Sequence, residues 1–174
     1  MKLAFTMAPG RGDTDLLLQG LAAAARERGI RAAGIVQINT ERPDAGPCDM
    51  DVKVLPDGPV LRISQSLGVG ARGCRLDPAS LEQAVGLVAA DLQRGADCLI
   101  VNKFGKHEAE GRGFRPLVAD ALAAGLPVLV GVNTLNLEAF KAFSGGLAVQ
   151  LPPVAAELRG WLYQAAREPA PVGR

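Results

Sequence analysis

The stretch MAPGRGDTDLLL, residues 7–18, places a glycine-containing turn between two apolar segments. Residues 2–7 form a short apolar run that predicts a strand, and residues 13–28 have leucine and alanine at helical spacing. A strand, a glycine-containing loop and a helix in this order are the layout of a phosphate-binding loop, whose backbone N–H groups hold the phosphates. The position of the lysine in such a loop is occupied by Asp13. The stretch therefore predicts a fold, but it leaves the phosphate chemistry open.

The rest of the chain continues the alternation of strand-like and helix-like segments. Further strands are expected at 31–38, 97–102, 127–132 and 147–151, with helices that start at Asp77-Pro78 or span 114–124, 135–143 and 153–167. The runs 51–55 and 60–64 flank the turn sequence PDG and predict a small antiparallel hairpin. Alternating strands and helices predict an α/β fold, a three-layer sandwich with a mainly parallel sheet. We expect a single domain over 1–167 and a frayed tail at 168–174.

Composition narrows the range of partners. The net charge of +1 over 174 residues gives no general attraction to nucleic acid. No apolar run approaches the roughly 20 residues of a membrane span, and the start of the chain does not resemble a signal peptide. Cys48, Cys74 and Cys98 are an odd and widely spaced set, which favours a reducing compartment. We therefore expect a cytoplasmic protein without a membrane span or a nucleic-acid partner.

The candidate ligand-binding residues follow the predicted strands, because ligands of parallel α/β sheets bind beyond the carboxyl ends of the strands. They are Gly10, Arg11, Gly12, Asp13, Thr14, Arg72, Arg75, Asn102, Lys103 and Lys106. Basic side chains gather in these loops, and a small anionic ligand is one explanation. Ordinary solvated loop charges are the other.

These segments resemble the small P-loop nucleoside-triphosphatases of the cancer-related and thermophilic type. APGRGDTDLLL, residues 8–18, follows the outline of their phosphate loop and its leucine-rich helix. CLIVNKFGKHE, residues 98–108, is similar to their second acidic motif, in which a strand ends in Asp-Glu. This resemblance implies a P-loop NTPase-like fold with degenerate Walker motifs.

The chain is more similar to a bacterial family of uncharacterised P-loop-like proteins often encoded beside molybdate transport genes. ISQSLGVGARGCRLDP, residues 63–78, and VNKFGKHEAEGRGFR, residues 101–115, look like the family's signature stretches. The resemblance implies a link to molybdenum metabolism, with proteins of molybdate uptake as partners. It implies no particular activity.

Three positions depart from a working triphosphatase. Asp13 replaces the lysine that reaches the outer phosphates, and Asn102 replaces the carboxylate that would hold the metal. Lys103 replaces the acidic residue that would orient the attacking water. At about 4 Å and an effective dielectric of about 20, one unit charge contributes about 4 kcal/mol. Each change disfavours hydrolysis.

Asp13 has two interpretations. Its carboxylate caps the free N–H groups of the helix and fills the anion position from within. Alternatively, Arg11, Lys103 or Lys106 replaces the missing lysine from another direction. Thr14 remains available to a metal or a phosphate oxygen.

The resulting hypothesis is a non-hydrolytic protein that binds a nucleotide or a small oxyanion. The alternative is an active nucleoside-triphosphatase with a rearranged phosphate and metal site. The ligand would be a nucleotide with Mg²⁺, or molybdate or another oxyanion, and no catalytic residue is assigned. Cys74, flanked by arginines, and His107 remain open as reactive or ligating groups. The sequence also leaves a homodimer open.

Overall fold

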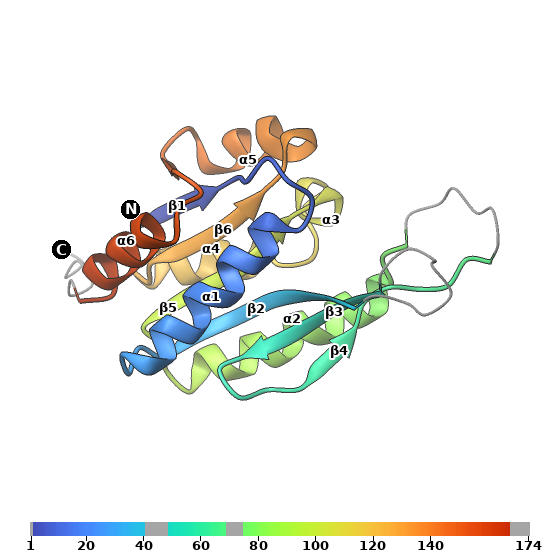
Figure 1. Ribbon diagram of the computed structural model, residues 1–174, viewed down its shortest axis with the longest axis horizontal. Helices are drawn as coiled ribbons and strands as arrows, with labels where there is room; N and C mark the ends of the chain where they lie inside the picture. Colours follow the sequence, from blue (N-terminus) through green and yellow to red (C-terminus); the bar gives the residue numbers. More distant parts are fainter. Residues whose placement is uncertain (1, 41–48, 69–74, 168–174) are drawn as a thin grey trace.

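The computed structural model describes residues 2–40, 49–68 and 75–167, which form a seven-stranded sheet with helices on both faces (Figure 1). The elements are β1 (Leu3–Thr6), α1 (Asp13–Glu27), β2 (Ala32–Thr40), β3 (Asp49–Leu55), β4 (Val60–Arg62), α2 (Pro78–Gln93), β5 (Cys98–Phe104), α3 (Lys106–Ala109), α4 (Arg115–Ala123), β6 (Val128–Val132), the 3₁₀ helix η1 (Thr134–Asn136), α5 (Leu137–Ser144), β7 (Val149–Leu151) and α6 (Ala155–Arg167). The predicted α/β sandwich is confirmed. The predicted tail, 168–174, lies outside the described residues.

The sheet is mainly parallel, as predicted, with the strand order β4-β3-β2-β5-β6-β1-β7. Strand β1 pairs in parallel with β6 and β7, and β5 pairs in parallel with β2 and β6. The predicted hairpin is formed by β3 and β4, and β3 also pairs with β2 in antiparallel fashion. The hairpin therefore extends one edge of the sheet. Strand β6 lies between β1 and β5 and is parallel to both, so the carboxyl ends of the three strands lie at the same end of the sheet.

Alternating side chains along the central strands supply two apolar layers. On one face of the sheet, Ala4 of β1 and Ile100 of β5 pack against α1 and α6. The helices contribute Leu18 and Leu21 from α1 and Leu158 from α6. Leu3, Phe5 and Val130 are among the strand residues that pack with α2, α4 and α5 on the other face of the sheet. Strands buried on both faces need apolar residues at nearly every position, which explains their uninterrupted apolar runs.

Two helix starts test the expected caps. The carboxylate of Asp77 accepts hydrogen bonds from the backbone N–H groups of Ala79 and Ser80 and from the Ser80 hydroxyl. The Ser80 hydroxyl bond is the main cause of the lowered pKa of Asp77, and the predicted cap is confirmed. The sequence also predicts a helix at 135–143, and the segment after β6 is capped by Asn133, whose side-chain oxygen accepts from the N–H of Asn136 at 3.0 Å.

The amino ends of the parallel strands lie on the side of the sheet opposite their carboxyl ends and the loops that follow them. Arg31 joins three segments there: its N–H donates to Asp97 at 2.7 Å, and its guanidinium donates to Asp91 and the Gly95 carbonyl.

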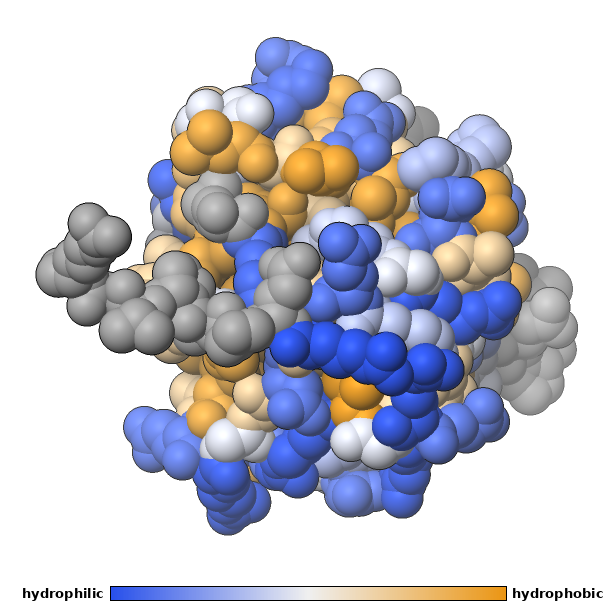
Figure 2. Space-filling view, turned by 90° about the vertical axis from the view of Figure 1, so that its left-hand side faces the viewer, coloured by the Kyte–Doolittle hydropathy of each residue, from blue (hydrophilic) through white to orange (hydrophobic). Residues whose placement is uncertain are grey.

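Hydrophilic and apolar residues are interspersed on this side, with the larger apolar area in the upper half of the view (Figure 2). Among the described residues, no helix is long and apolar enough to cross a membrane.

Gly34 in β2 tests how closely the central strands pack. Its φ is +121°, and a Cβ there would lie 1.8 Å from the carbonyl oxygen of Ile100 in β5. We predict that Gly34→Ala lowers the free energy of unfolding by about 3 kcal/mol, measured by urea denaturation, because both the backbone and the strand pair must shift.

Gly86→Ala is the matched control. Gly86 lies in α2 with open space around the added methyl group, so this variant should gain about 0.5–1 kcal/mol. Equal stability of Gly34→Ala and the wild type would contradict the strand spacing described here.

Candidate functional site

A crevice of about 780 Å³ lies at the carboxyl ends of the parallel strands. Its walls are the loop at 7–12, the first turn of α1 and the residues that end β2, β5 and β6. The predicted position beyond the strand ends thus contains a cavity large enough for a small molecule, since ligand sites typically measure about 300–1,000 Å³.

A hydrogen bond to a threonine in the first turn of α1 closes the loop after β1. The Oγ1 of Thr14 accepts a hydrogen bond from the backbone N–H of Ala8 at 3.0 Å. Gly12 precedes α1 with a φ of +83°, a conformation that favours glycine. Gly131 at the end of β6 permits a close approach, because a Cβ there would lie 2.1 Å from the Asn102 carbonyl oxygen and 3.0 Å from the Thr14 methyl carbon. The sequence analysis missed Gly131, since nothing local distinguishes it from other strand glycines.

Asp15 is the carboxylate that faces the crevice. Its Oδ1 accepts from the side-chain amide of Asn102 at 2.8 Å, and its Oδ2 accepts from the amide of Asn39 at 2.7 Å. Asn102 is 2% exposed, and its side-chain oxygen accepts from the backbone N–H of Gln37 at 2.8 Å. The Gln37 side chain in turn donates to Asn39 at 2.8 Å. A single carboxylate therefore connects the start of α1 to the ends of β2 and β5.

This network explains why position 102 is an amide. An aspartate there would bring a second carboxylate to hydrogen-bonding distance of Asp15, and like charges so close together repel. Asparagine instead donates to Asp15 with one end and accepts from Gln37 with the other. The acid of the crevice lies on the helix and the amide lies on the strand.

Asp13 differs from the expected self-capping arrangement. Its side chain is exposed and makes no hydrogen bond or ion pair within the described part of the chain. A methyl group placed on Gly10 would lie 2.0 Å from Oδ2 of Asp13, so the carboxylate is folded over the loop backbone. Asp13 lines a separate groove beside α6 rather than the crevice. It still benefits from the positive end of the α1 dipole, but the capping hydrogen bond is not formed.

The candidate cations divide into two groups. Arg11, Arg75 and Lys103 line the crevice. Lys106 does not: its side chain is 82% exposed and its Nζ lies 3.9 Å from Oε1 of Glu110. Arg72 lies outside the described residues. The structure thus brings three of the expected basic residues to one place.

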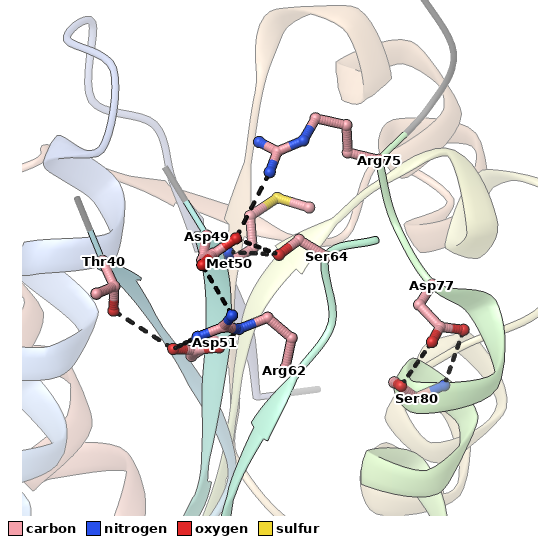
Figure 3. Close-up of polar contacts among 9 residues, drawn as sticks. All are labelled: Thr40, Asp49, Met50, Asp51, Arg62, Ser64, Arg75, Asp77 and Ser80. Carbon is pink, nitrogen blue, oxygen red and sulfur yellow. Dashed lines mark hydrogen bonds and ion pairs between the residues drawn. The ribbon is translucent and has the colours of Figure 1, made fainter. Parts of the chain in front are cut away.

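Arg75 lies where the crevice meets the hairpin. Its Nη2 is 3.8 Å from Oδ1 of Asp49, and Arg62 contacts Asp49 at 2.8 Å and Asp51 at 2.6 Å (Figure 3). Hydrogen bonding to Asp51 is the main cause of the raised pKa of Arg62. The two aspartates are therefore occupied by arginines.

The described residues do not fit a Mg²⁺ site of the kind the fold implies. Mg²⁺ prefers several carboxylate, hydroxyl or water oxygens in octahedral geometry. Asp15 is the one carboxylate among the described residues that line the crevice, and Asn102, where the resemblance predicts a second carboxylate, lacks a charge. No cluster of three or more His, Cys, Asp or Glu side chains suited to a metal occurs within the described ranges.

The remaining candidates lie away from the crevice. Burial raises the pKa of Cys98 to about 12, which makes it an unreactive core thiol, as expected from its strand. His107 lies on α3 and does not line the crevice. Its neighbour Glu108 is 4% exposed and accepts from the backbone N–H groups of Gly105 and Phe114, which is a structural role. Cys48 and Cys74 lie outside the described residues.

The chain is similar to known proteins in both sequence and structure. A "Molybdenum import ATP-binding protein ModC 2" of Bradyrhizobium diazoefficiens is 40% identical over 141 residues, which are 80% of this chain and 16% of that protein. The chain thus spans only a small part of this relative's length. The solution structure of a human cancer-related nucleoside triphosphatase matches with a TM-score of 0.58 at 20% identity, over 94% of this chain and 95% of that one.

The structural match confirms the fold expected from the phosphate-loop resemblance, that of the P-loop nucleoside-triphosphatases. Residues 3–161 match the family described as "Protein of unknown function (DUF2478)", which is nearly the whole chain. The chain belongs to the DUF2478 family and has a P-loop NTPase-like fold.

Proposed function

We propose that the chain binds a nucleoside phosphate in the crevice and does not hydrolyse it. The observation that supports this most is the Asp15 network, in which two amides bind the one carboxylate among the described lining residues, and Asn102 stands where a metal-binding carboxylate is expected. Backbone N–H groups at the start of α1 and three basic side chains at the same crevice favour an anionic ligand.

The size of the crevice favours a nucleotide over a bare oxyanion. A volume of about 780 Å³ is within the range of sites for drug-sized ligands. A tetrahedral oxyanion such as molybdate or phosphate would fill only a small part of it. Gln37, Asn39 and Asn133 also line the crevice and supply amide groups for the polar parts of a larger ligand.

Hydrolysis needs groups that are not found among the described residues lining the crevice. Phosphoryl transfer depends on a metal that neutralises developing charge and on a residue that orients the attacking water. Lys103 is in the place of the acidic residue, and Asn102 replaces the metal-side carboxylate. The alternative, an active triphosphatase, is favoured by Thr14, Gly10 and Gly12, which keep the loop geometry.

The physiological context that we propose is molybdenum uptake in the cytoplasm. The support is the relative whose name describes a molybdenum import ATP-binding protein and which shares 40% identity over the aligned segment. In this proposal the chain acts with proteins of molybdate uptake. Its nucleotide is a regulatory or structural ligand and is not hydrolysed to supply energy.

Calorimetric titration separates the ligand classes. We expect heat of binding with ATP or GTP and none with phosphate, molybdate or tungstate at equal concentration, because a nucleotide can contact more of the crevice than an isolated oxyanion. Binding of molybdate alone, with no response to either nucleotide, would replace the nucleotide proposal with an oxyanion proposal.

A phosphate-release assay tests the absence of hydrolysis. We predict no Mg²⁺-dependent release of phosphate from ATP or GTP above the background of buffer, since the three chemical positions have changed together. Thr14→Ala is the control variant. Steady turnover by the wild type that disappears in Thr14→Ala would establish the active enzyme instead.

A further inference from the structure

We infer that Lys103 supplies the positive charge that the loop lysine provides in related folds, and that the crevice binds a nucleoside polyphosphate without a divalent cation. This inference rests on the proposed function, which it deepens by naming the residue and the metal-free form of the ligand. It selects one of the three basic residues that the sequence left open.

The backbone of Lys103 is fixed at the wall of the crevice by its neighbours in β5. It lies in β5 between Asn102, which is 2% exposed, and Phe104, which is 1% exposed. Phe104 packs edge-on against Phe140 with ring centroids 5.2 Å apart. The pairing of β5 with β6 shifts register between Val101 and Phe104, and such irregularities often re-aim side chains beside sites. The Lys103 backbone is thus fixed while its side chain remains exposed at the crevice.

The charge of Lys103 is available to a ligand. Within the part of the chain that the structure describes, no carboxylate forms an ion pair with Lys103 or Arg11. The acid at the crevice, Asp15, already accepts from two amides, so it is held in place by neutral partners. Two cations at a cavity without acidic partners favour a ligand that brings negative charge.

The other two basic candidates are less suited to this role. Lys106 is directed away from the crevice and lies near Glu110. Arg11 lines the crevice, but it lies in the exposed loop and lacks the buried neighbours that fix Lys103. Lys103 extends from a strand whose neighbouring residues are buried, so its backbone loses less conformational freedom on binding than the backbone of an exposed loop residue such as Arg11.

Metal-free binding follows from the same groups. In metal-dependent sites the cation neutralises the phosphates and is held by carboxylate or hydroxyl oxygens. Here Arg11 and Lys103 bring positive charge from the protein itself, and Asn102 stands where a metal-binding carboxylate is expected. Chelation of Mg²⁺ should therefore leave binding intact.

The test is calorimetric titration of the full chain with ATP, once with Mg²⁺ and once with EDTA. We expect comparable dissociation constants in the two buffers. Lys103→Met should weaken binding by about tenfold or more, the loss expected for one charge-assisted contact, while Lys103→Arg should retain most of it. Lys106→Met is the matched control, because it removes the same charge three residues away, and it should bind like the wild type.

Any of four results would overturn the inference. Binding of ATP by the wild type that requires Mg²⁺ would contradict the metal-free form but leave nucleotide binding in place. Unchanged affinity in Lys103→Met, or equal losses in Lys103→Met and Lys106→Met, would remove the assigned role. Absence of ATP binding in both buffers would refute the proposed function as well. Urea denaturation of each variant verifies that a loss of binding is not a loss of folding, and Lys103→Arg separates charge from structure.

Discussion

The carboxylate of Asp15 is the interaction on which the crevice depends. It accepts one amide from the end of β2 and one from the end of β5, so it fixes the start of α1 against two strands that are distant in sequence. Asn102 is buried and would leave unsatisfied polar atoms if Asp15 were removed, which is costly in a protein interior. The loop at 7–12 is attached to the same helix, so its position relative to the sheet follows from this contact.

The placement of the acid also decides what the site can do. A carboxylate at a strand end is placed to bind a metal. The carboxylate of Asp15 lies on the helix instead, where two amides bind it, and it fixes α1 against β2 and β5. Asp13 and Asn102 stand where the resemblance predicts a phosphate-binding lysine and a metal-binding carboxylate. Under the proposed function, the crevice recognises a ligand without breaking it down. Function thus depends on the site more than on the fold.

Much of the fold could be predicted because its determinants are local. Apolar runs identify the central strands, and Asp77 with Pro78 identifies the start of α2. The location of a crevice at the carboxyl ends of the strands also followed from the parallel sheet. The network did not, because Asp15 and Asn102 are 87 residues apart in the chain and their hydrogen bond exists only in the folded protein. For Asp13 the local pattern was misleading: a first-turn acid is a common cap, but here the carboxylate lies over the loop at Gly10 and accepts no capping N–H.

A double-mutant cycle on Asp15 and Asn102 tests this account most directly. The free energies of unfolding of the wild type, Asp15→Asn, Asn102→Asp and the double variant are measured by urea denaturation. If Asp15 and Asn102 are a matched acid–amide pair, Asn102→Asp should be strongly destabilised, and the exchange of both residues should recover at least about 1 kcal/mol of that loss. If the two effects simply add, to within about 0.5 kcal/mol, the pair is not coupled and the central claim is wrong.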